Sequence, residues 1–175
     1  TPAQILFINL IMDGIKAVAL SVEPAQKWIM ELPPRNPKKG ILTRHSYLYI
    51  FFVGLLICIV SMAVYLWALK TKGHLTAVTL LFVTIILLRT FNAFNCRSER
   101  QSVFELGIFS NKWLIYAFIV TVVLTLPVLY VPLLQRVFST TSLGLMEWLI
   151  VFSVSSTVFI LVEIVKFIKF KRLRT

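Results

Sequence analysis

The chain has 175 residues, of which 58% are hydrophobic and 14% charged, and its formal net charge at pH 7 is +11. This apolar share exceeds that of soluble domains and lies in long runs, which excludes an ordinary soluble domain. The period-two alternation of a transmembrane barrel is missing, so we expect an all-α fold, a polytopic membrane bundle of five transmembrane helices. The expected spans are residues 3–22, 48–69, 75–94, 113–132 and 145–167, each with the roughly 20 residues that a helix needs to cross a bilayer.

Basic residues gather in the segments that one side of a five-span arrangement would hold. Thirteen fall there, against three on the other side, which are Lys70, Lys72 and Arg136. The thirteen are Lys27, Arg35, Lys38, Lys39, Arg44, Arg97, Arg100, Lys112, Lys166, Lys169, Lys171, Arg172 and Arg174. The positive-inside rule therefore predicts that loops 23–47 and 95–112 and the C-terminus are cytoplasmic. Contact with anionic lipid accounts for this charge, so no nucleic-acid partner is expected.

The first span carries polar groups in the middle of an apolar run. Asn9 and Asp13 are four residues apart, so on a helix they share a face. A bare carboxylate in hydrocarbon costs several kcal/mol, which implies that a cation, a proton or a basic partner compensates Asp13. Gly14 is expected to let the helix open so that backbone carbonyls join these oxygens. Lys16 could neutralise Asp13 instead, or extend toward the cytoplasmic face.

A proline-rich stretch follows the first span. Pro33, Pro34 and Pro37 exclude a helix there and predict extended, polyproline-like backbone beside Arg35. Two interpretations remain open: a semi-rigid cytoplasmic loop that docks on another domain, or a solvated connector, which is the commoner case.

The later spans hold few ionisable residues. Arg89 either extends to the cytoplasmic interface or faces the bundle near Asp13. Pro127 predicts a kink or an early helix end, and Glu163 is expected to form an ordinary helix-surface pair with Lys166. The turn at residues 70–74 is short, so the second and third spans should be antiparallel neighbours.

The side-chain chemistry points to ion handling. We find no phosphate loop, no Cys/His metal cluster and no Ser/His/Asp set in the sequence, so whether the chain itself is an enzyme is left open. Ca²⁺ takes 6–8 oxygen ligands, whereas Asn9 and Asp13 supply at most three. Thr84, Asn92 or freed carbonyls could add one or two, and the rest would have to come from helices upstream of Thr1. The start at Thr1 without an initiator Met also suggests a C-terminal piece of a longer protein.

Several stretches together resemble the C-terminal transmembrane region of P-type Ca²⁺-transporting ATPases, of the secretory-pathway or bacterial type. They include Ile11-Met12-Asp13-Gly14, Pro33-Pro34-Arg35, Phe91-Asn92-Ala93-Phe94-Asn95, Ser102-Val103-Phe104-Glu105 and Leu129-Tyr130-Val131-Pro132. The resemblance implies that the five spans are helices six to ten of the pump. It also implies that Asn9 and Asp13 are Ca²⁺ ligands, and that ATP and Mg²⁺ bind upstream domains that are not part of this chain.

Departures from the family pattern concern the ion site. Two-ion pumps carry a threonine where this chain has Met12, and an acidic ligand where it has Arg89. Both changes remove oxygens from one of the two sites, so we expect a single Ca²⁺ per cycle. Lys16 stands where the relatives usually have proline.

Three hypotheses follow. The first is the C-terminal membrane half of an ATP-driven Ca²⁺ pump, whose partners are the lipid bilayer, the transported cation and the upstream helices and cytoplasmic domains of the same pump. The second is a P-type pump for protons or another cation, with the site altered by Lys16 or Arg89. The third is a non-transporting membrane scaffold or regulatory subunit. The type of resemblance suggests a bacterial or archaeal plasma membrane.

Overall fold

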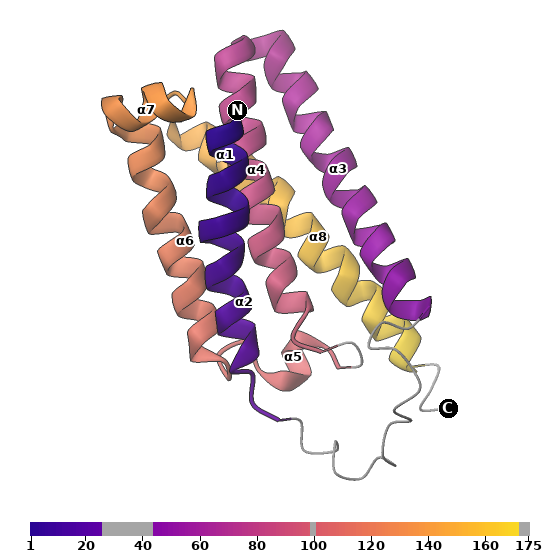
Figure 1. Ribbon diagram of the computed structural model, residues 1–175. Coiled ribbons are helices and arrows are strands. Elements are labelled where there is room, and N and C mark those ends of the chain that lie inside the picture. Colours follow the sequence, from indigo (N-terminus) through magenta and orange to yellow (C-terminus); the bar gives the residue numbers. More distant parts are fainter. Residues whose placement is uncertain (26–43, 99–100, 172–175) are drawn as a thin grey trace.

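The computed structural model describes residues 1–25, 44–98 and 101–171, and every regular element in these ranges is a helix (Figure 1). In chain order these are α1 Pro2–Leu6, the π-helix η1 Phe7–Met12, α2 Asp13–Ser21, α3 Arg44–Lys72, α4 His74–Asn95, α5 Val103–Leu106, α6 Lys112–Tyr130, α7 Pro132–Phe138 and α8 Leu145–Lys171. The coupling-loop residues Pro33, Pro34, Arg35 and Pro37 lie outside the described ranges.

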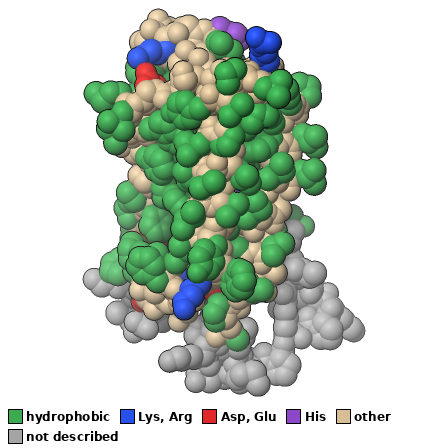
Figure 2. All heavy atoms as spheres, turned by 90° about the vertical axis from the view of Figure 1, so that its left-hand side faces the viewer, with side chains coloured by type: hydrophobic (Ala, Val, Ile, Leu, Met, Phe, Trp, Pro, Cys, Tyr) green, Lys and Arg blue, Asp and Glu red, His purple; other side chains and the backbone are tan. Residues whose placement is uncertain are grey.

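Five helices are long and apolar enough to cross a membrane, which confirms the predicted fold class. One of them is the continuous run α1–η1–α2, and the others are α3, α4, α6 and α8. The 22 residues of α4 extend over about 33 Å at helical rise, close to the thickness of a hydrocarbon core. Figure 2 shows one face of this bundle, on which hydrophobic side chains cover the middle and charged side chains lie at the two ends.

α4 is the central helix of the bundle. In its most apolar stretch 61% of the residues are buried, against 17–33% in the other four spans. It packs most extensively against α3 and α8, and Leu80, Val83 and Leu87 of α4 belong to the main core cluster. Only Gly73 separates α3 from α4, so the two helices run antiparallel side by side, as the short turn predicts.

The helix ends that border the basic segments of the sequence lie at one end of the bundle. Figure 1 shows that α2 and α4 end on the side where α6 begins and α8 terminates, whereas Thr1, the α3–α4 turn and α7 lie at the opposite end. α6 continues through Pro127 and ends three residues later at Tyr130. Pro132, which we expected at the end of that span, instead starts the separate short helix α7.

Glu163 and Lys166 of α8 form a buried pair, so the prediction of an ordinary helix-surface pair is wrong. Each residue is 6% exposed, and Nζ of Lys166 lies 3.4 Å from Oε1 of Glu163. Glu163 also accepts hydrogen bonds from the Ser102 hydroxyl and the Val103 backbone N–H, while Lys166 donates to the Asn95 carbonyl at 2.7 Å. These bonds fasten the end of α4 and the start of α5 to α8.

Candidate functional site

The helix that carries Asn9 and Asp13 is irregular just before the carboxylate. Phe7–Met12 form a π-helix, and the Asp13 backbone N–H donates to the carbonyl of Ile8, five residues earlier. Such π turns are rare and occur frequently at functional sites. The irregularity therefore precedes Gly14, which lies within the regular turns of α2, and the expected opening at the glycine is wrong.

Arg89 of α4 reaches across to this helix and binds both predicted ligands. Its Nη1 donates to Oδ2 of Asp13 at 2.5 Å and to the Asn9 side-chain oxygen at 3.1 Å. One guanidinium nitrogen contacts both oxygens, so Asn9 and Asp13 present the same face. Of the two placements that the sequence left open, Arg89 adopts the one that faces the bundle near Asp13.

Lys16 approaches the other oxygen of the same carboxylate. Its Nζ lies 3.0 Å from Oδ1 of Asp13, as an ion pair that lacks the alignment of a hydrogen bond. The Lys16 side chain is buried, whereas those of Asp13 and Arg89 are 37% and 39% exposed. Asp13 is thus contacted by two cationic side chains, and its pairing with Arg89 is the more accessible of the two.

The other residues that the sequence suggested for the ion site do not place further side-chain oxygens beside Asp13. Met12 is fully buried and belongs to the main apolar core cluster. Asn92 is engaged elsewhere, because its side chain contacts the Tyr49 hydroxyl and the Cys96 sulfur. Thr84 is buried, and its hydroxyl has no hydrogen-bond partner.

Within the described residues, no group of three or more Asp, Glu, His and Cys side chains could hold a metal ion. Asn9 and Asp13 offer at most three oxygens, fewer than the six to eight that Ca²⁺ takes. A cation that binds Asp13 would meet two positive side chains at close range, which repel it. The arrangement can bind a positive group at the Asp13 carboxylate. In this structure that group is the Arg89 guanidinium, with the Lys16 ammonium beside it.

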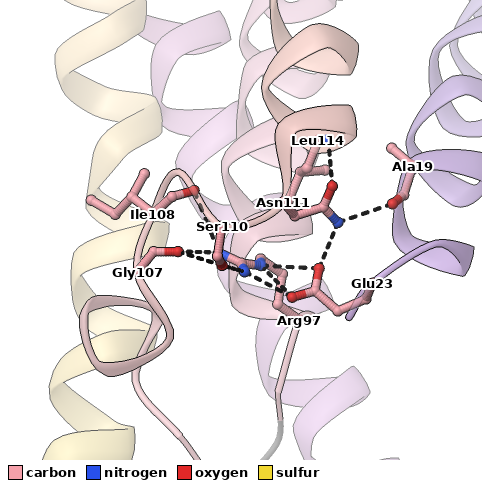
Figure 3. Close-up of polar contacts among 8 residues, drawn as sticks. All are labelled: Ala19, Glu23, Arg97, Gly107, Ile108, Ser110, Asn111 and Leu114. Atoms are coloured by element: carbon pink, nitrogen blue, oxygen red, sulfur yellow. Dashed lines mark hydrogen bonds and ion pairs between the residues drawn. The ribbon is translucent and has the colours of Figure 1, made fainter. Parts of the chain in front are cut away.

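A second polar cluster lies where α2 ends, and sequence reasoning missed it (Figure 3). The Arg97 side chain is 1% exposed and forms an ion pair with Glu23 at 2.7 Å. Arg97 was grouped with the basic residues that face lipid, and that interpretation is wrong for it. The available signal was the lone acid Glu23 beside Pro24, directly after the first span.

Comparisons with known proteins agree with the resemblance. The family model for the C-terminus of cation transporting ATPases matches residues 1–168. The chain is 39% identical to the calcium-transporting ATPase type 2C member 1 of Pongo abelii over 165 residues, which are 93% of the chain. It is also 37% identical to calcium-transporting ATPase 1 of Yarrowia lipolytica over 168 residues, and 35% identical to the human type 2C member 2 over 166 residues.

The matched part is a small share of each relative. The chain covers 93–95% of its own length in these comparisons but only 17–18% of the relatives' lengths. The five membrane-spanning helices, the family match and the relatives agree. The chain belongs to the cation-transporting ATPase family and is a C-terminal transmembrane region of the P-type Ca²⁺-ATPase kind.

Proposed function

We propose that this chain is the C-terminal membrane half of an ATP-driven Ca²⁺ pump and that Asn9 and Asp13 contribute to a single intramembrane Ca²⁺ site. The observation that carries the proposal is the convergence of both side-chain oxygens on one cation, the Arg89 guanidinium. A pair of oxygens that accepts one positive group in this position is suited to accept another. The calcium-transporting relatives named above supply the identity of the ion.

Ca²⁺ and Arg89 would then compete for the same oxygens. The side chains of Asp13 and Arg89 are each more than one-third exposed among the described residues, so part of the carboxylate stays open to another cation. A divalent ion that gains further oxygens from helices upstream of Thr1 can therefore displace the guanidinium. ATP and Mg²⁺ would act in the upstream cytoplasmic domains, and the loop with Pro33, Pro34, Arg35 and Pro37 would transmit their movement to the helices.

A second candidate function follows from the two ion pairs of Asp13. If Lys16 and Arg89 hold the carboxylate throughout the cycle, the pump moves protons or another cation in place of Ca²⁺. The third hypothesis, a non-transporting scaffold, gains no support from the relatives, which are named as transporting ATPases.

The proposed orientation places loops 23–47 and 95–112 and the C-terminus in the cytoplasm. The support is the charge imbalance described above, together with the position of the ends of α2, α4 and α8 and the start of α6 at one end of the bundle. The expectation of a bacterial or archaeal plasma membrane gains no support from the relatives named here, because they come from eukaryotes.

The test is the ratio of Ca²⁺ transported to ATP hydrolysed by the full-length pump in sealed vesicles. A ratio near one supports a single site formed with Asn9 and Asp13, and a ratio near two contradicts it. A pH-sensitive dye in the same vesicles separates the candidates. ATP-driven proton movement without uptake of radioactive Ca²⁺ would favour the second.

A further inference from the structure

The cluster around Arg97 joins three helices at the end of the bundle where α2 terminates (Figure 3). Arg97 directly follows the C-cap of α4, Glu23 lies two residues beyond α2, and Asn111 is the N-cap of α6. These residues are far apart in the sequence, and their side chains point toward one another. The transport mechanism proposed above uses none of them.

All three guanidinium nitrogens of Arg97 are engaged. Nε donates to both carboxylate oxygens of Glu23, at 2.9 and 3.1 Å, and Nη2 donates to Oε1 at 2.7 Å. Nη1 donates to the Gly107 carbonyl at 2.9 Å, and Nη2 also donates to the Ser110 hydroxyl. Such a planar, forked set of bonds is one that lysine cannot reproduce.

Asn111 completes the connection to α2. Its amide nitrogen donates to Oε2 of Glu23 at 2.6 Å and to the Ala19 carbonyl at 3.1 Å, near the C-terminal end of α2. Its oxygen meanwhile accepts from the Leu114 backbone N–H as the cap of α6. Above these bonds, Ala19, Ala93 and Ala117 let α2, α4 and α6 approach closely.

α2 and α4 are therefore bridged by two ion pairs of unlike character. The first, Asp13–Arg89, is more than one-third exposed on both sides and lies at the candidate ion site. The second, Glu23–Arg97, is buried at the arginine, 17% exposed at the glutamate, and bonded to α6 as well. A buried charge pair whose remaining groups are satisfied is costly to open by removal of one partner.

We infer that Arg97 is a positioning residue, which fixes the end of the ion-site helix against α4 and α6 so that Asp13 can exchange Arg89 for the transported cation without displacement of the whole helix. The inference rests on the proposed function for its consequence, transport, but the clamp of Glu23, Arg97 and Asn111 is defined by its own contacts. It predicts that loss of Arg97 loosens α2 and weakens cation binding two to three helical turns away.

The experiment compares Arg97→Leu and Glu23→Gln with Arg136→Leu in the full-length pump. Arg136 is an exposed arginine of α7 at the other end of the bundle, so its substitution is the matched control. Radioactive Ca²⁺ uptake is measured at equal amounts of folded, purified pump. We expect the half-saturating Ca²⁺ concentration to rise about threefold or more in each clamp variant, as for contacting, coupled residues, with no change in the control.

The double variant separates positioning from general destabilisation. If Glu23 and Arg97 act through each other, Glu23→Gln with Arg97→Leu shifts the half-saturating concentration no further than either single change. Equal half-saturating concentrations in all variants, or additive shifts in the double variant, would overturn the inference.

A second measurement does not depend on the transported ion. Spin labels at Ser21→Cys and Lys112→Cys, both exposed positions at the ends of α2 and α6, report the distance across the clamp in a pump whose other cysteines are replaced. We expect one narrow distance distribution with Arg97 present and a broad one with Arg97→Leu. The same distance distribution with and without Arg97 would overturn the clamp. If the wild-type pump moves no Ca²⁺, the proposed function is overturned, and the distance measurement alone decides whether the clamp exists.

Discussion

Arg89 of α4 donates to Asp13 through Nη1, 2.5 Å from Oδ2, and the same nitrogen contacts Asn9 on the preceding turn. The contact joins the central helix of the bundle to its irregular first helix. It supplies the positive partner that a carboxylate in this position needs. The same contact places a tethered cation where the transported cation is proposed to bind.

Removal of this tethered cation should favour Ca²⁺ binding. In Arg89→Gln we expect the half-saturating Ca²⁺ concentration for uptake to fall about threefold, on the scale of the coupling between two groups in contact. Arg136→Gln is the matched control and should leave the half-saturating Ca²⁺ concentration unchanged. If uptake is lost in Arg89→Gln although the variant folds, Arg89 is required for transport and does not compete with the ion.

Met12 should not be convertible into an ion ligand by a single change. Its side chain is fully buried in the apolar core with Phe7 and Leu80. Met12→Thr would leave a cavity and a buried hydroxyl, and we expect it to lower the free energy of unfolding by about 2–4 kcal/mol. The Ca²⁺:ATP ratio of the variant should stay near one, and a rise toward two would show that position 12 alone decides the number of ions.

The buried pair of α8 should matter for stability. Lys166→Met leaves the Glu163 carboxylate buried beside Ser102 without its cation, a change that costs roughly 3–5 kcal/mol in buried pairs. We expect the thermal unfolding temperature of the purified pump to fall in Lys166→Met, and Glu163→Gln added to it to restore part of the loss. Lys72→Met removes an ion pair with Glu147 whose lysine is 44% exposed and should have a smaller effect, so equal losses in both lysine variants would contradict the buried role.

The orientation can be tested by the exposure of a tag. An epitope added after Thr175 should be accessible in intact cells only after the membrane is permeabilised, because the basic C-terminal tail favours the cytoplasm. In pump expressed at the plasma membrane, a tag inserted in the short turn at Gly73 should be accessible without permeabilisation if the span count holds. A C-terminal tag that is accessible without permeabilisation in a plasma-membrane pump would reverse the proposed orientation.

The fold class of five membrane-spanning helices was predictable from the sequence because the length and polarity of each apolar run are local properties. The 22 residues of α4, for instance, are bounded by Gly73 and by the polar segment after Asn95, and both limits are visible in the sequence. The shared face of Asn9 and Asp13 likewise follows from their spacing. The π-helix at Phe7–Met12 was not predictable, because no glycine or proline marks it and the expected opening was assigned to Gly14.

The misread residues were charged groups at the end of the bundle where α2 and α4 terminate. Arg97 and Lys166 look like lipid-facing positive charges when only their own stretches of sequence are considered. Their partners come from other parts of the chain, Glu23 for Arg97 and the Asn95 carbonyl for Lys166. Such long-range pairs depend on how the helices pack, and hydropathy and charge counts carry no information on that. The choice between the two placements of Arg89 was open for the same reason.

The most direct measurement is ATP-driven uptake of radioactive Ca²⁺ by the full-length pump with Asp13→Asn, compared with wild type and with Glu147→Gln. The Asp13 change preserves the shape of the side chain and removes its charge, and Glu147→Gln makes the same chemical change in a pair with Lys72 at the other end of the bundle. We predict that Asp13→Asn reduces uptake about tenfold or more, on the scale of a lost interaction with a charged group, while Glu147→Gln transports like wild type. Unchanged uptake in Asp13→Asn would remove this carboxylate from the ion site.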